Sequence, residues 1–257
     1  MPTKVPIDQL IKHSYGWMPD LPDHRDYLFT ATRRAVAKLP SSVDLRAGCP
    51  PVEDQGALGS CTGNAIVGAL EFLELKDNLP LVDLSRLFVY YNERVMEHTV
   101  QSDAGAQIRD GVKSVAKQGV CSEATWPYLI SKFAVKPTAA CYTEALKHRV
   151  VEYHRLSTLD DMRACLAEGY PFVFGFTVYE SFESQQVAKT GTVPLPRKNE
   201  RVLGGHAVLG VGYNDRQKRF IVRNSWGTGW GKQGYFTMPY NYLANPDFAS
   251  DFWVVHR

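Results

Sequence analysis

Three short segments of this chain carry side chains whose types and order indicate one chemistry. They read Gln-Gly-Ala-Leu-Gly-Ser-Cys at 55–61, Gly-His-Ala-Val at 205–208 and Val-Arg-Asn-Ser-Trp-Gly at 222–227. They supply a thiol, an imidazole, an amide that can orient the imidazole and an amide that can bind an oxyanion, from Cys61, His206, Asn224 and Gln55. These four groups suffice for acyl transfer through a thiolate.

The local sequence gives each group a position suited to that role. Cys61 starts an apolar helical pattern, and a helix N-terminus stabilises a thiolate. His206 follows two glycines and opens an expected strand, so it can face a cleft. The amide of Gln55 and the backbone N–H of Cys61 can bind an oxyanion, which is worth about 3 kcal/mol of barrier per donor. Alone, Cys61 would be interpreted as a small buried apolar residue and Gln55 as a surface glutamine.

Asn224 ends the next expected strand, and its amide oxygen can accept a hydrogen bond from the imidazole. Trp226 follows two residues later and can shield this hydrogen bond from water, which strengthens it. The alternative is that Asn224 caps a turn and that Trp226 is only part of the core.

The elements that must position these groups differ between the two halves of the chain. Apolar spacing predicts helices over 61–76, 85–97 and 108–117. Later segments predict strands over 171–178, 206–213 and 219–224, a hairpin turn over 214–218 and a short helix over 160–168. We therefore expect two lobes with a cleft between them, a common place for ligands.

Composition restricts the partners. The 257 residues carry a net charge of +2, which gives no support to binding of nucleic acid or of an anionic membrane. No apolar run approaches the ~20 residues of a membrane span. Residues 1–21 contain no continuous apolar segment, so we expect no secretory signal in the given sequence. The localisation stays open between the cytoplasm and export through a signal outside this sequence.

The cysteine pattern predicts neither a metal site nor a single disulfide scheme. The five cysteines are Cys49, Cys61, Cys121, Cys141 and Cys165. No Cys-x-x-Cys pair occurs, so no metal is expected. Buried free thiols are the favoured interpretation, and a disulfide framework is the weaker alternative.

With these motifs in view, the chain resembles papain-like cysteine peptidases from about Leu39 to its C-terminus. The segments that carry the resemblance are 55–61, 205–213, 224–231 and Gly234-Tyr235. The resemblance implies an α+β papain-like fold with a helical left lobe over 39–145, a β-barrel-like right lobe over 146–257 and the active-site cleft between them. It also implies Cys61 as nucleophile, His206 as acid and base, Asn224 as orienting residue and Gln55 as oxyanion donor.

The resemblance further implies where a substrate binds. Gly105 matches a glycine whose backbone pairs with an extended substrate. Gly175 and Gly205 match walls of the pocket for the second residue before the scissile bond, and small residues there predict a roomy, apolar pocket. Trp226 and Trp230 complete the expected substrate-binding surface.

Two departures from the family pattern occur near the nucleophile. Leu58 and the segment 103–107 stand where many relatives carry the two halves of a disulfide. Thr62 replaces an aromatic residue that normally follows the nucleophile.

Residues 1–38 are too short for the helical prodomain of most relatives, and their layout resembles a bacterial and viral subgroup with short N-terminal segments. The segment is irregular and rich in Pro, Asp and aromatic residues, and basic residues precede Leu39-Pro40. We expect it to be a short pro-segment that crosses or flanks the cleft and is cut near Leu39. A surface arm packed on the body is the equal alternative.

The sequence therefore predicts a cysteine endopeptidase, made as a zymogen, that needs no metal or organic cofactor. Its expected partners are polypeptide substrates and its own N-terminal segment. One alternative is a thiol amidase or transferase that acts on cell-wall or isopeptide bonds with the same groups. The other, a non-catalytic binding relative, is disfavoured because all four groups are present.

Overall fold

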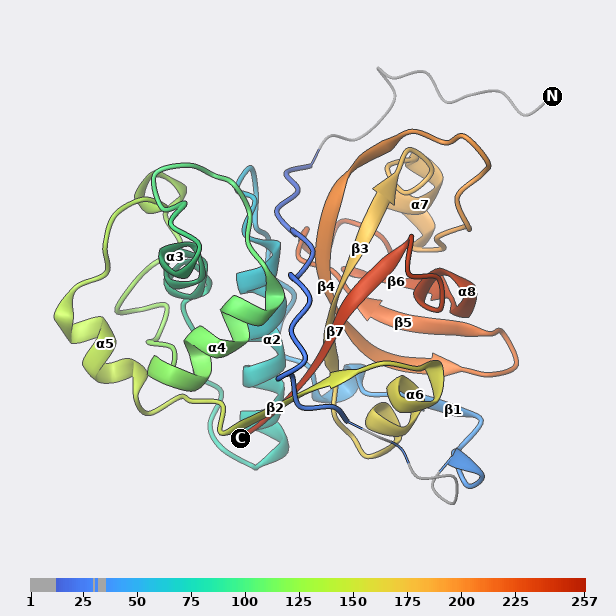
Figure 1. Cartoon of the computed structure of the whole chain (residues 1–257), viewed down its shortest axis with the longest axis horizontal. Coiled ribbons are helices and arrows are strands. Elements are labelled where there is room, and N and C mark those ends of the chain that lie inside the picture. Colours follow the sequence, from blue (N-terminus) through green and yellow to red (C-terminus); the bar gives the residue numbers. More distant parts are fainter. Residues whose placement is uncertain (1–12, 30, 32–35) are drawn as a thin grey trace.

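The computed structural model describes residues 13–29, 31 and 36–257. The helices of residues 86–145 gather on one side of the molecule and the antiparallel sheet lies on the other with the later short helices around it, and helix α2 (Cys61–Lys76) lies between the two sides (Figure 1). The two-lobed α+β arrangement expected from the sequence is confirmed. The lobe boundary at 145/146 stays a prediction.

The helical side is built around α2 (Cys61–Lys76), which is buried from Cys61 to Glu74 because it is apolar on nearly every face. It packs against α3 (Arg86–Met96) and α4 (Ile108–Gln118). As the sequence predicts, Ser85 caps α3: its hydroxyl accepts a hydrogen bond from the Phe88 backbone N–H at 3.1 Å. Gly119, with φ of 78°, ends α4.

Shorter helices complete this side and the rim of the sheet. The sequence pattern predicted α6, with both ends shifted by one residue from the observed Leu159–Ala167, but did not predict α5, α7 or α8. The remaining helical elements are η2 (Arg46–Gly48), η3 (Ile130–Lys132), α5 (Ala139–Ala145), α6 (Leu159–Ala167), α7 (Gln185–Thr190) and α8 (Tyr240–Leu243). The unpredicted helices have four to seven residues, which is too short for a helical period to be visible in the sequence.

All strands pair antiparallel in one sheet of order β2-β7-β3-β4-β5-β6, and β1 also pairs with β4. The two end strands, β2 and β6, do not pair with each other, so the right lobe that the resemblance implied to be β-barrel-like is an open antiparallel sheet. The strands are β1 (Ser42–Asp44), β2 (Glu152–Leu156), β3 (Phe172–Tyr179), β4 (Val202–Asn214), β5 (Arg219–Arg223), β6 (Tyr235–Pro239) and β7 (Ala249–His256).

Strand register positions the groups singled out in the sequence. On β3 and β4, Gly175 pairs with Ala207 and Phe176 with His206. On β4 and β5, Leu209 pairs with Arg223, the residue before Asn224. Helix α2 packs against β4, and the Ala207 backbone N–H of β4 donates to the sulfur of Cys61, so the N-terminus of α2 meets the middle of β4.

The N-terminal segment runs between the helical lobe and the sheet as the dark-blue trace of Figure 1. We call its described residues 13–29 the arm. The arm pairs with both sides: Trp17 forms a parallel bridge with Ala106, and its N–H donates to the Gly205 carbonyl at 3.0 Å. None of the helices in the described part of the chain is both long and apolar enough to cross a bilayer.

Candidate active site

Cys61 is the first residue of α2, as the sequence predicts, and its side chain is fully buried against β4. The Ala207 backbone N–H donates to its Sγ at 3.4 Å. Ala207 follows His206, so the start of α2 and the histidine segment of β4 come together although they lie far apart in the chain. This placement gives the thiol a helix N-terminus and an adjacent imidazole.

His206 is fully buried and its Nε2 lies 2.8 Å from Oδ1 of Asn224. Its Nδ1 has no hydrogen-bond partner, so this nitrogen is available to the neighbouring thiol. The ring of Trp226 stacks on the imidazole with centroids 4.7 Å apart. Trp226 therefore shields the His206–Asn224 hydrogen bond in the way its position in the sequence suggests.

Gln55 is buried, and hydrogen bonds fix both its backbone and its side-chain amide. Its backbone N–H donates to the Ser225 carbonyl at 2.9 Å, and its Oε1 accepts from the Ser225 hydroxyl at 2.7 Å. Its Nε2 donates to the Leu58 carbonyl at 2.9 Å and to the Ser14 carbonyl of the arm at 3.2 Å. The amide thus donates to a peptide carbonyl, which an oxyanion donor must also do.

Burial sets the charge state of the thiol and the imidazole. Desolvation raises the pKa of Cys61 to about 12, against smaller opposing effects of backbone N–H groups. Desolvation also lowers the pKa of His206 to about 4, although Asn224 favours the charged ring. With the arm in place, both groups are neutral at physiological pH.

The arm covers these groups with its backbone. The Ala106 N–H donates to the Gly16 carbonyl at 2.7 Å, and the Met18 N–H donates to the Ala106 carbonyl at 3.0 Å. The Gly16 backbone N–H lies at the sulfur of Cys61 and opposes the rise of its pKa. The arm therefore fills the space in front of the thiol.

The three glycines expected to contact substrate all lie against the arm. A Cβ built on Gly175 would lie 1.9 Å from the ring of Trp17, and one on Gly205 would lie 2.4 Å from the Trp17 carbonyl. A Cβ on Gly105, whose φ is 74°, would lie 2.2 Å from the Gly16 carbonyl. The missing side chains of Gly175 and Gly205 leave room for the indole of Trp17, which is 8% exposed. We call this space the glycine-walled pocket.

The two expected tryptophans differ in position. The imidazole of His13 stacks on Trp226 with centroids 3.7 Å apart, so Trp226 faces the arm. Trp230 packs edge-on against Trp226 at 5.1 Å and against Phe182 and Phe236. It supports Trp226 from the core side.

Two residues of the site were not predicted from the sequence. Ser225 fixes Gln55, and its place directly after Asn224 was the available signal. Trp17 fills the glycine-walled pocket, but nothing in an irregular segment indicates which aromatic side chain enters the cleft. The expected cleavage stretch includes Arg33 and Arg34, which lie outside the described residues.

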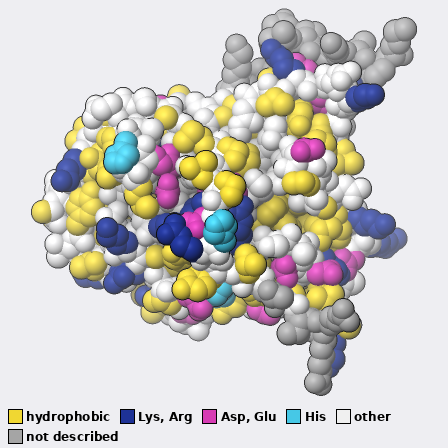
Figure 2. Space-filling view, viewed as in Figure 1, with side chains coloured by type: hydrophobic (Ala, Val, Ile, Leu, Met, Phe, Trp, Pro, Cys, Tyr) yellow, Lys and Arg dark blue, Asp and Glu magenta, His cyan; other side chains and the backbone are white. Residues whose placement is uncertain are grey.

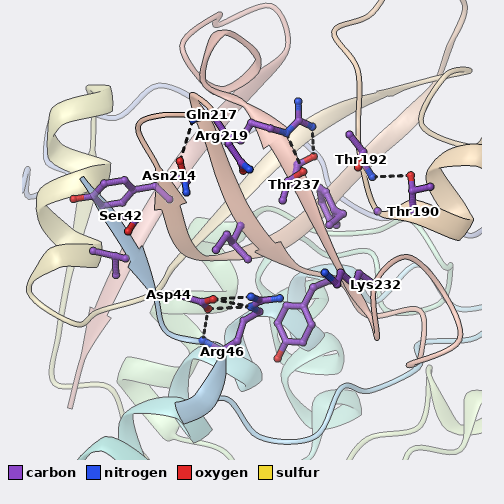
Figure 3. Close-up of a pocket in the computed structure, with 16 residues that line it drawn as sticks. Ser42, Asp44, Arg46, Thr190, Thr192, Asn214, Gln217, Arg219, Lys232 and Thr237 are labelled. Carbon is purple, nitrogen blue, oxygen red and sulfur yellow. Dashed lines mark hydrogen bonds and ion pairs between the residues drawn. The ribbon is translucent and has the colours of Figure 1, made fainter. Parts of the chain in front are cut away.

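A separate pocket of about 440 Å³ lies at β1, β4, β5 and β6 (Figure 3). Its guanidinium groups are already engaged: Arg46 donates to Asp44 at 2.6 Å, and Arg219 donates to Thr237 and to the Val193 carbonyl. None of the four groups that the resemblance assigns to catalysis lines it. This pocket is therefore distinct from the thiol–imidazole site.

All five cysteines are free thiols in this structure, as the favoured interpretation has it. Cys49 is partly exposed and the others are buried. Among the described residues, no group of three or more His, Cys, Asp or Glu side chains could hold a metal ion.

Comparison with known proteins identifies similar chains. A model of the papain family of cysteine proteases matches residues 39–251. An uncharacterized peptidase C1-like protein of Acanthamoeba polyphaga mimivirus is 44% identical over 273 residues, which cover 96% of this chain and 88% of the viral protein. Mouse pro-cathepsin H is 30% identical over 245 residues, covering 88% of this chain and 67% of pro-cathepsin H. The chain spans 65% of the length of cysteine proteinase 3 of Entamoeba histolytica, to which it is 28% identical.

Solved structures agree with these matches. Xylellain, a cysteine protease from Xylella fastidiosa, has a TM-score of 0.89 at 43% identity, with 98% of each chain covered. Digestive procathepsin L 3 from the Tenebrio molitor larval midgut has a TM-score of 0.72 at 21% identity, covering 90% of this chain and 74% of that one. The second likeness supports the fold alone, whereas the viral protein and xylellain agree with the subgroup expected from the sequence.

Proposed function

Because this chain belongs to the papain family of cysteine proteases, we propose that it is an endopeptidase whose N-terminal arm keeps it inactive until the arm is displaced or cut near Leu39. The observation that carries the proposal is the position of the arm. Its backbone lies at the sulfur of Cys61, and its Ser14 carbonyl accepts a hydrogen bond from Gln55.

The mechanism follows from the roles of the four groups. His206 takes the proton of the Cys61 thiol, and the Sγ attacks the peptide carbonyl carbon, while the oxyanion accepts hydrogen bonds from the Nε2 of Gln55 and the Cys61 backbone N–H. His206 protonates the leaving amine, which leaves a thioester on Cys61. Water, deprotonated by His206, then attacks the thioester carbon; the C–S bond breaks, the carboxylic acid product is released, and Cys61 recovers its proton from His206. Asn224 keeps the ring of His206 facing the sulfur, as its 2.8 Å contact allows.

The direction of the arm explains why it can lie in the cleft without being cleaved there. In a bound substrate, the residues that fill the glycine-walled pocket precede the carbonyl at Gln55. In the arm, Trp17 fills that pocket but follows Ser14, whose carbonyl Gln55 contacts. The arm therefore runs opposite to a substrate, and Cys61 does not meet its carbonyl in productive geometry.

Charged groups beyond the pocket support docking of the arm. Asp26 of the arm accepts from Arg109 at 2.6 Å, and the arm's Asp20 accepts from the Trp253 indole N–H at 2.8 Å. Arg155 lies 3.3 Å from Asp26 and 2.7 Å from Asp251. Basic, acidic and histidine side chains gather near the centre of this face, where the arm runs (Figures 1 and 2). These contacts hold the arm on both lobes.

Hydrolysis of an internally quenched peptide with both ends blocked tests the proposal. The substrates are offered to the full chain and to the chain cut before Leu39 after folding, through an inserted protease site. We expect turnover inside the peptide by the cut chain, at least about tenfold slower turnover by the full chain, and none by Cys61→Ala. Equal turnover by full and cut chains would remove the inhibitory role of the arm. Cleavage only of peptides with a free end would exclude the endopeptidase assignment.

A further inference from the structure

Glu183 is a buried carboxyl group that the proposed mechanism does not use. It lies in the turn between β3 and α7 and is 1% exposed. The preceding residue, Phe182, packs on Trp226 with centroids 5.5 Å apart. The turn that carries Glu183 is thus anchored on Trp226, the residue that stacks on His206.

The partners of Glu183 all come from the arm. Its Oε1 accepts a hydrogen bond from the Tyr15 hydroxyl. Its Oε2 has no hydrogen-bond partner; the ionisable nitrogen recorded near it is the Nε2 of His13 at 3.9 Å, and burial lowers the pKa of that imidazole. No Lys or Arg among the described residues forms an ion pair with it. When the arm leaves, this carboxyl group loses its partners and opens onto the cleft.

The position along the cleft identifies the side of the substrate that meets Glu183. Trp17 occupies the pocket for residues before the scissile bond, and Gly16 lies at the sulfur of Cys61. Tyr15 precedes Gly16 in the arm, so it lies on the other side of Gly16 from Trp17, with its ring edge-on to His206 at 6.3 Å. That side is where the amine leaves, because His206 protonates it there.

We propose that Glu183 is a specificity-determining residue on the leaving-group side, where its carboxylate selects peptides with Lys or Arg directly after the scissile bond. Tyr15 reaches Glu183 from the position next to the residue at the sulfur, and Lys and Arg side chains have a similar reach. Either one brings several donors and a positive charge, so it satisfies the oxygen that the phenol leaves free. A buried carboxylate without a cation is costly, and a basic substrate side chain removes that cost.

This inference rests on displacement of the arm proposed above. Its test uses the full chain cut before Leu39 after folding and separated from the arm. Peptides that differ only in the residue after the scissile bond, as Lys, Arg, Tyr, Leu or Glu, are compared by kcat/KM. We expect kcat/KM of the Lys and Arg peptides to exceed that of the Leu peptide by about tenfold, because only a basic side chain can form a charge-assisted hydrogen bond with Glu183. Glu183→Gln, which keeps the shape and loses the charge, should bring the Lys to Leu ratio close to one.

Glu180→Gln is the matched control, because Glu180 lies in the same turn but pairs with Arg201 at 2.8 Å. It should keep the basic preference. The proposal is overturned if Glu183→Gln keeps the ratio of the unchanged protein, or if the unchanged protein prefers Leu or Glu. Binding of the same peptides to Cys61→Ala gives the ranking without turnover. A chain that binds basic peptides tightly but cleaves none would contradict the proposed function and leave this inference standing.

Discussion

At the scale of single residues, the site consists of groups that are each fixed by a neighbour. Asn224 accepts from His206, Trp226 covers the imidazole, and Ser225 fixes Gln55. These three neighbours are consecutive in sequence. The segment 224–226 therefore fixes both the imidazole of His206 and the amide of Gln55, the groups that we propose as acid–base group and oxyanion donor.

Asn224→Ala should lower kcat of the cut chain by at least about tenfold with little change in KM, because it removes the acceptor that orients His206 and not a substrate contact. Asn224→Asp keeps an acceptor oxygen and should retain more activity. Steady-state kinetics on one peptide checks this. A fall in kcat/KM that arises only from KM would mean that Asn224 acts on binding.

Gly175→Val should shift selectivity for the second residue before the scissile bond. A side chain here enters the space that the Trp17 ring occupies, with a Cβ only 1.9 Å from that ring. In the cut chain, the preference for Phe over Ala at this substrate position should fall by about tenfold, because the valine side chain takes up space that the phenyl ring needs. Peptide competition measures the ratio. An unchanged ratio would show that Gly175 does not line the pocket.

At the scale of elements, the sequence predicts what depends on local pattern. The capped helix after Ser85, the end of α4 at Gly119 and the hairpin between β4 and β5 all follow from short-range signals. The four catalytic candidates were identifiable because their flanking residues form a recognisable motif. The path of the arm was not, since Trp17 and Tyr15 are placed by pockets built from distant strands.

Trp17→Ala should make the arm a weaker inhibitor in the full chain. The indole is nearly fully buried in the glycine-walled pocket, and its removal costs about 3 kcal/mol of docking, which weakens docking roughly a hundredfold, so the activity of the full chain should approach that of the cut chain. Tyr27→Ala is the matched control, since Tyr27 lies in the same arm and is 72% exposed. Activities of the two variants that do not differ would show that Trp17 does not anchor the arm.

At the scale of the whole molecule, a buried carboxyl group makes the stability of the folded state depend on pH. Glu71 on α2 accepts from the Leu84 backbone N–H at 2.8 Å, and burial raises its pKa from 4.5 to about 8. The folded state therefore binds a proton that the unfolded state releases. The contribution of Glu71 to stability is complete below pH 4.5 and is lost as the pH rises through about 8.

Glu71→Gln should therefore flatten the fall of the melting temperature between pH 5 and pH 9, because glutamine still accepts from Leu84 and does not titrate in this range. Asp247→Asn, at an exposed side chain that forms no ion pair among the described residues, should leave the slope unchanged. Thermal melts across this range measure both. The assignment fails if the slope of Glu71→Gln equals that of the unchanged protein.

The central claim is that Cys61 is the nucleophile and that the arm keeps it neutral and covered. Labelling with an epoxysuccinyl thiol reagent at pH 7, read by intact mass, tests it most directly in the full chain and in the chain cut before Leu39. The account predicts one adduct, on Cys61, absent in Cys61→Ala and formed at least about tenfold faster after the cut, because each pKa unit that the thiol recovers raises the thiolate fraction tenfold. Equal rates in the two forms, or an adduct on another cysteine, would contradict it.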